Sequence, residues 1–141
     1  MVHHNLNRFL DAQESQYQMV INEIKKSRKR THWMWLFFPQ ITGLGFSETS
    51  KFYAINDFQE ATDFLNHKIL GTRLVYMSEL LLEIKNKTVL DIFGSPDNLK
   101  LNSCMTLFGS VPNASIVFEK VIDQYFNGIP DHQTLQIIKS L

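Results

Sequence analysis

The sequence has a single cysteine, no long apolar run and no excess of charge of either sign. Cys104 has no second cysteine to pair with, and the N-terminus lacks the basic-then-apolar form of a signal peptide; a reducing compartment is therefore expected. The longest apolar run lies within Trp33–Phe38, far short of the roughly 18 residues that a membrane-spanning helix requires. We therefore expect a soluble, cytoplasmic protein with no membrane partner.

Net charge excludes another class of protein. Fourteen basic residues balance fourteen acidic ones, which argues against binding of nucleic acid by bulk electrostatics, although a local basic patch remains an alternative.

Alternation of apolar and polar residues, the pattern of a half-buried strand, is also missing. Apolar residues instead recur at steps of three and four, which predicts an all-α protein. We expect a single compact domain over residues 1–141, with about seven helices in an orthogonal arrangement rather than a simple bundle.

Helix boundaries are predicted from apolar spacing, capping residues and glycine stops. A long amphipathic helix is predicted for Leu6–Ile24. Further helices are predicted for Ser47–Tyr53, from Asp57 onward, for Leu70–Ile84, Thr88–Phe93, about Pro96–Phe108 and about Asn113–Phe126, and from Asp131 onward. Cys104 falls on the apolar stripe of the helix after Pro96, so we expect a buried thiol rather than a nucleophile.

Several motifs occur in a fixed order along the chain. They include His32-Trp33-Met34-Trp35, Phe38-Pro39-Gln40 and Met105-Thr106-Leu107-Phe108. With them the sequence resembles the bacterial domain-of-unknown-function family 1810, over about Asn5 to Leu135. The resemblance implies a single, mainly helical bacterial domain, and it implies no settled reaction, cofactor or partner.

The segment from Trp33 to Gln40 has no clean helical period. Six large apolar residues precede Pro39, and successive side chains of a helix cannot all point inward. Some of them therefore line a cleft, or the whole segment passes through the centre of the core. Trp35 offers a stacking face and Gln40 offers both a donor and an acceptor, which suits a ligand pocket.

Asp97, Lys100 and Ser103 follow one another at three-residue steps and share one face of a predicted helix. A carboxylate, an ammonium and a hydroxyl near a helix N-terminus are suited to binding an anion or to transferring a proton. The alternative is an ordinary surface ion pair between Asp97 and Lys100, with Ser103 incidental.

Histidines are scattered rather than clustered. They stand at His3, His4, His32, His67 and His132. None has the spacing that would place two ligands on one helix face, so we expect no metal site and no cofactor. His3 and His4 are expected to belong to a flexible end.

A basic run precedes the two tryptophans. It consists of Lys25, Lys26, Arg28, Lys29 and Arg30, with Ser27 among them. Cations beside aromatic residues are typical of phosphate contact combined with base stacking. The alternative interpretation is a solvated helix end beside core tryptophans, in which case the run is peripheral.

Two functional hypotheses follow. The first is a small-molecule site for a nucleotide-like or phosphorylated ligand, in which Arg73 is notable because it interrupts an apolar helix face and needs a carboxylate or phosphate partner. Its candidate residues are Trp33, Trp35, Gln40, Tyr53, Arg73, Asp97 and Lys100. The second is a non-catalytic module that binds nucleic acid or an acidic protein through Lys25–Arg30 and the neighbouring aromatic residues. The sequence assigns no catalytic residue and no oligomeric state, and it leaves open whether the protein is an enzyme.

Overall fold

The computed structural model describes residues 5–140, and this part of the chain folds into ten helices without a strand. They are α1 (Asn7–Glu14), α2 (Tyr17–Lys25), α3 (Met34–Phe37), α4 (Glu48–Phe52), α5 (Phe58–Asn66), α6 (Leu70–Glu83), α7 (Val89–Phe93), α8 (Asp97–Gly109), α9 (Val117–Phe126) and α10 (His132–Ser140). The all-α prediction is confirmed. The predicted count of about seven was too low: of the eight helix ranges predicted above, one is divided into two, and a helix of four residues follows Trp33.

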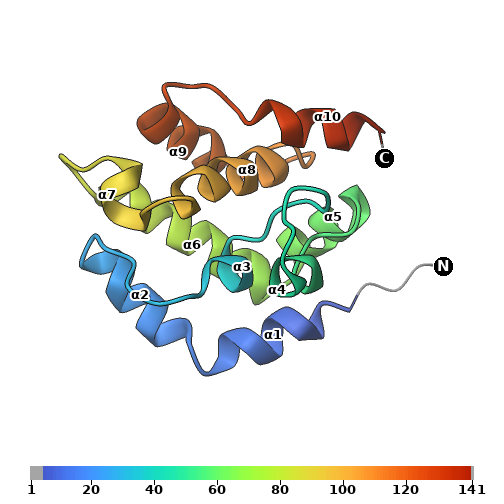
Figure 1. The fold of residues 1–141 in the computed structure, drawn as a ribbon, viewed down its shortest axis with the longest axis horizontal. Helices are drawn as coiled ribbons and strands as arrows, with labels where there is room; N and C mark the ends of the chain where they lie inside the picture. Colours follow the sequence, from blue (N-terminus) through green and yellow to red (C-terminus); the bar gives the residue numbers. More distant parts are fainter. Residues whose placement is uncertain (1–4, 141) are drawn as a thin grey trace.

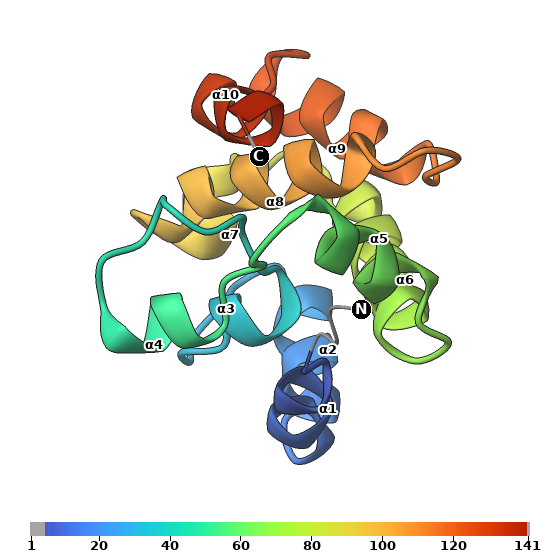
Figure 2. The ribbon, with the colours of Figure 1, turned by 90° about the vertical axis from the view of Figure 1, so that its right-hand side faces the viewer.

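The helices surround a central pair, α6 and α8 (Figure 1). Helices α1 and α2 lie on one side of this pair, and α9 and α10 lie on the opposite side. After a quarter turn, α1 and α10 are seen nearly end-on while α8 is seen from its side (Figure 2). The helices therefore run in several directions rather than in one parallel bundle.

Helix α8 contacts more of the molecule than its single predicted apolar stripe suggests. It packs against α5, α7, α9 and α10. Most of its length is consequently buried on every side, including Leu107, which the predicted stripe did not include. The thiol of Cys104 is fully buried, and burial raises its pKa well above the usual value. The prediction that this cysteine is part of the core is confirmed.

The predicted first helix, Leu6–Ile24, is divided at Ser15 and Gln16 into α1 and α2. The two halves pack against different partners, α1 against α3 and α2 against α6. Gln13, at the end of α1, is buried and donates a hydrogen bond to the carbonyl oxygen of Leu36 at 2.7 Å. Because the apolar stripe continues across the break, its periodicity did not indicate the division.

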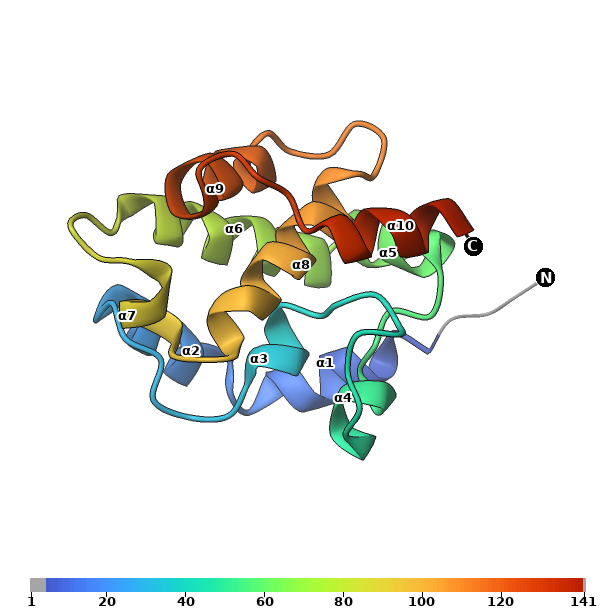
Figure 3. The same cartoon turned by 45° about the horizontal axis from the view of Figure 1, so that its top comes forward.

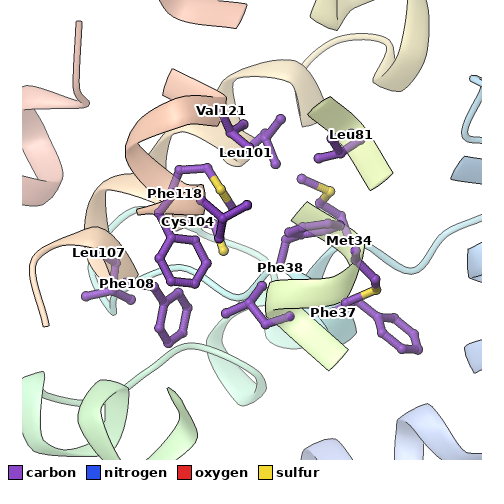
Figure 4. Close-up of a cluster of buried hydrophobic side chains, with 14 of the residues drawn as sticks. Met34, Phe37, Phe38, Leu81, Leu101, Cys104, Leu107, Phe108, Phe118 and Val121 are labelled. Carbon is purple, nitrogen blue, oxygen red and sulfur yellow. The ribbon is translucent and has the colours of Figure 1, made fainter. Parts of the chain in front are cut away.

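The segment that follows Trp33 passes through the middle of the core. Met34, Phe37 and Phe38 are almost completely buried. They belong to one cluster of buried side chains with Leu81 of α6, Cys104 of α8 and Phe118 of α9 (Figure 4). The core interpretation of the Trp33–Gln40 segment thus holds for these residues, and the exceptions are Trp35 and Gln40, which are half-buried.

The turn between α2 and α3 is held by a buried carboxylate. Glu23 accepts hydrogen bonds from the indole N–H of Trp33 at 2.8 Å and from the backbone N–H groups of Arg30 and Thr31 at 2.7 and 3.2 Å. The hydroxyl of Thr31 donates to its second oxygen at 2.7 Å. The same turn lies against α7 (Figure 3), where the backbone N–H of Lys29 donates to the Ile92 carbonyl at 2.7 Å.

Burial by itself raises the pKa of the Glu23 carboxyl, but the hydrogen bonds from Arg30, Trp33 and Thr31 outweigh burial and leave that pKa below its ordinary value. The ionised form is therefore the one that the fold stabilises. A carboxyl whose pKa is lower in the folded state adds stability above its unfolded pKa, and this stability is lost as the pH falls through the folded pKa.

A second buried carboxylate ties α1 to α5. Glu60 is fully buried, and its two oxygens lie 2.9 and 3.1 Å from the Nη2 and Nη1 atoms of Arg8. The guanidinium also donates to the carbonyl oxygens of Phe52 and Ala54 at 2.9 and 2.8 Å. This bidentate pair with satisfied neighbours is the geometry in which a buried ion pair is tolerated.

We expect Arg8→Met to lower the free energy of unfolding by about 3–5 kcal/mol, because it leaves the Glu60 carboxylate buried without its cation. The double variant Arg8→Met/Glu60→Leu should lose less, since no uncompensated charge then remains. Urea unfolding at neutral pH measures both. A loss below about 1 kcal/mol in the single variant, which is typical of an exposed pair, would contradict a structural role for this ion pair.

We expect Glu23→Gln to destabilise the protein at pH 7, and this difference from wild type to shrink as the pH falls below the ordinary glutamate pKa of about 4.3. Thermal unfolding midpoints from pH 7 down to pH 3 measure it. Glu14→Gln, at an exposed position on α1, is the matched control. A difference that stays constant over this range would show that the ionised form of Glu23 is not the one stabilised.

Candidate ligand-binding cleft

Three of the seven candidate residues line one cleft. Trp35, Gln40 and Lys100 border a cleft of about 520 Å³, which we call the Trp35 cleft. Its other side chains include Phe46, Ser103 and Asp131. The cleft thus lies between α3 with the loop that follows it and the first half of α8 with the start of α10.

The loop from Gln40 to Phe46 forms one wall of the cleft. Its start is fixed by an isolated parallel bridge between Ile41 and Ile55, in which the Ile55 N–H donates to the Gln40 carbonyl at 2.8 Å. At Gly45 the loop passes so close to α4 that an added Cβ would lie 2.4 Å from the Ser50 hydroxyl, which explains the glycine. The next residue, Phe46, projects into solvent with 89% of its surface exposed.

Lys100 lies against the ring of Trp35. Its ammonium is 4.8 Å from the ring centroid, and it is also 3.3 Å from a carboxylate oxygen of Asp97. An ammonium over a tryptophan face is a favourable cation–π contact. The ion pair predicted between Asp97 and Lys100 is confirmed. The indole N–H of Trp35 is buried and has no hydrogen-bond partner within residues 5–140.

Asp97 has a second cation that sequence spacing did not indicate. The ammonium of Lys29 lies 2.9 Å from its other oxygen and 5.2 Å from the ring centroid of Trp33. The Lys29 side chain is only 7% exposed. The prediction that the basic run is peripheral is therefore wrong for Lys29, although the rest of the run consists of exposed residues apart from the half-buried Ser27.

Ser103 is bonded to a different carboxylate. Its hydroxyl donates to Asp131 at 3.0 Å, and Asp131 also accepts from the backbone N–H of Thr134 at 3.2 Å and from the Thr134 hydroxyl. Asp131 therefore caps α10 and closes one end of the cleft. A helix start at Asp131 is expected from the sequence, but neither this residue nor Phe46 was among the predicted site residues. Neither the hydrogen bond between Ser103 and Asp131 nor the position of Phe46 at the cleft follows from helical periodicity.

The remaining candidate residues lie outside the Trp35 cleft. Trp33 is fully buried and donates to Glu23, so its ring offers no surface for stacking. Tyr53 packs against the rings of Phe9 and Phe52, with centroids 5.9 and 4.9 Å away.

Arg73 has a fixed partner, as its position within an apolar helix face predicted, but this partner is a neutral amide and not the expected carboxylate or phosphate. The partner is the side-chain oxygen of Gln13, at 3.1 Å, and the guanidinium also lies 4.4 Å from the ring centroid of Tyr17. Arg73 therefore braces α6 against α1 and α2 instead of facing the cleft. Tyr17 is partly buried, and burial raises its pKa even though the nearby Arg73 lowers it.

Between residues 5 and 140, no three or more His, Cys, Asp or Glu side chains gather where they could hold a metal ion. His67 accepts backbone hydrogen bonds from Ile69 and Leu70 at the start of α6. His3 and His4 lie outside the described residues. None of the described helices is long and apolar enough to cross a membrane.

Comparison with known proteins places the chain in a family. Its structure is similar to the crystal structure of the conserved hypothetical protein Rv1873 from Mycobacterium tuberculosis, with a TM-score of 0.93 and 39% sequence identity, over 95% of this chain and 96% of that chain. No curated protein matches it. The family model described as "Protein of unknown function (DUF1810)" matches residues 3–138. Because this match covers nearly the whole chain, the protein belongs to the DUF1810 family.

Proposed function

We propose that the protein binds a small phosphorylated or nucleotide-like ligand in the Trp35 cleft. The observation that carries this proposal is the meeting of three kinds of group in one cleft: the half-buried ring of Trp35, the ammonium of Lys100 and the amide of Gln40. These groups come from α3, from the loop after it and from α8. Their convergence is a property of the fold rather than of any single motif.

Each group suits one part of such a ligand. The face of Trp35 stacks with a planar ring, which is a sequence-tolerant contact common in nucleotide binding. Gln40 and Asp131 offer hydrogen bonds to the polar edge of that ring, and Lys100 offers a positive charge to an anion. The volume of about 520 Å³ lies within the range of roughly 300–1,000 Å³ that is usual for small-molecule sites.

Lys100 is held in place before a ligand arrives. Asp97 orients its ammonium on one side and the Trp35 ring supports it on another. Because Lys29 also neutralises Asp97, Lys100 can turn towards an anionic ligand without leaving the carboxylate unpaired. This arrangement lowers the cost of ordering the lysine when the ligand binds.

The second candidate function is binding of nucleic acid or of an acidic protein through the basic run. The exposed side chains of Lys25, Lys26, Arg28 and Arg30 favour it. Burial of Trp33 argues against the base-stacking part of that hypothesis, because its ring is enclosed by the core. Of the two tryptophans that follow the basic run, Trp35 is then the one whose half-buried ring is available for stacking.

Calorimetry with a panel of nucleosides, nucleotides and sugar phosphates tests the first proposal. We expect a phosphorylated member to bind, and Lys100→Gln to weaken its affinity by about tenfold or more, the effect of losing one charge-assisted hydrogen bond. Trp35→Leu should weaken ligands that carry a planar ring and spare ring-free sugar phosphates. The matched control is Lys26→Gln, which removes the same charge from an exposed position outside the cleft.

Two outcomes would contradict the small-ligand proposal. One is a panel in which nothing binds the wild-type protein. The other is tight binding of an oligonucleotide that falls steeply with salt and is insensitive to Trp35→Leu, which would favour the basic run as the functional surface.

A further inference from the structure

A second hollow shares part of its lining with the Trp35 cleft. It has a volume of about 370 Å³, and we call it the basic hollow. Its charged and titratable lining consists of Lys29, Arg30, His32, Asp97 and Lys100. Trp35, Pro96 and Lys100 line both spaces. A ligand long enough to extend past these shared residues would therefore occupy both the cleft and the hollow.

The two spaces differ in charge. In the Trp35 cleft the charges of Lys100 and Asp131 cancel. In the basic hollow three cations face one carboxylate, Asp97, and that carboxylate is already paired with Lys29 and Lys100. The hollow thus has an excess of positive charge even with His32 neutral, and an anion is the complementary ligand.

Trp35, whose indole N–H has no partner within residues 5–140, lines the hollow, and Arg30 and His32 also bring unused donors to it. Both are exposed, and within residues 5–140 neither side chain takes part in an ion pair or a hydrogen bond with another residue. The backbone of Arg30 is nevertheless fixed, because its N–H donates to the buried Glu23 carboxylate at 2.7 Å. The Cα atom of Arg30 is therefore held at the edge of the hollow, and its guanidinium is free to turn towards an anion.

We propose that the basic hollow is a phosphate subsite, and that the ligand of this protein is a nucleoside with a phosphate chain of two or more groups. Its ring stacks in the Trp35 cleft, its chain passes Lys100, and its terminal phosphate binds Arg30 and His32. A planar guanidinium matches the oxygens of a phosphate in pairs, which suits Arg30 to the terminal position. This inference rests on the proposed function for the ring, whereas the phosphate subsite has its own test.

Inorganic pyrophosphate probes the basic hollow without the ring. We expect it to bind the wild-type protein at millimolar concentration or below, and to shift the backbone amide signals of Arg30 and His32 in nitrogen-15 NMR spectra. Arg30→Gln should weaken pyrophosphate about tenfold or more, as for a lost charge-assisted contact. Lys26→Gln, which removes an equal charge from the same basic run outside the hollow, should leave the affinity unchanged within about twofold.

A series of adenosine, AMP and ADP, repeated with the other bases, tests whether ring and phosphates bind as one ligand. Affinity should rise by about tenfold or more from nucleoside to diphosphate in wild type, and this gain should disappear in Arg30→Gln. Nucleosides that bind without any gain from phosphates would overturn the phosphate subsite and leave the proposed function standing. Pyrophosphate binding without nucleoside binding would retain the subsite and remove the ring from the proposal. If pyrophosphate affects neither Arg30 nor His32, the subsite is overturned directly.

Discussion

The hydrogen bonds of the Glu23 carboxylate fix the segment on which both the core and the candidate site depend. One carboxylate ties the end of α2 to Arg30, Thr31 and Trp33, and so sets where the chain enters α3. Trp33 is held in the core immediately before α3, and the helix then directs Met34 and Phe37 into the core as well. Trp35 stands about 100° and 200° around the helix from these two residues, so its half-buried ring lies at the cleft.

A row of alternating charges then links this segment to α8. Asp97 stands between the ammonium groups of Lys29 and Lys100, and each ammonium also lies over a tryptophan ring. Partial burial weakens solvent screening of these contacts, so they hold the two lysines better than an exposed surface pair would. The row therefore positions Lys100 at the Trp35 cleft while its other end is anchored beside the core.

Local patterns in the sequence predicted most of the helices but few of the side-chain contacts between them. The ion pair of Asp97 with Lys100 followed from three-residue spacing, and burial of Cys104 followed from an apolar stripe. The partner of Asp97 at Lys29, the partner of Ser103 at Asp131 and the contact of Arg73 with Gln13 connect residues that are distant in the chain. No helical period encodes such contacts, because they depend on how whole helices are placed against one another.

The division of α1 from α2 has the same origin. Its stripe of apolar residues continues through Ser15 and Gln16, so local spacing favours one helix. The tertiary contacts of each half with a different partner favour two helices.

The candidate site was predicted only in part, for a related reason. The sequence showed that a tryptophan and a lysine were available, and only the fold determined that Trp35, rather than Trp33, meets Lys100.

The four arginines of the chain illustrate how the fold separates structural from available charge. Arg8 is buried against Glu60, and Arg73 contacts Gln13 and Tyr17, so both side chains stabilise contacts between helices. Arg28 and Arg30 are exposed, but only Arg30 borders a hollow that also contains Trp35 and Lys100. The backbone of Arg30 is already fixed by the buried Glu23 carboxylate, so an anion that binds there has to order only the arginine side chain.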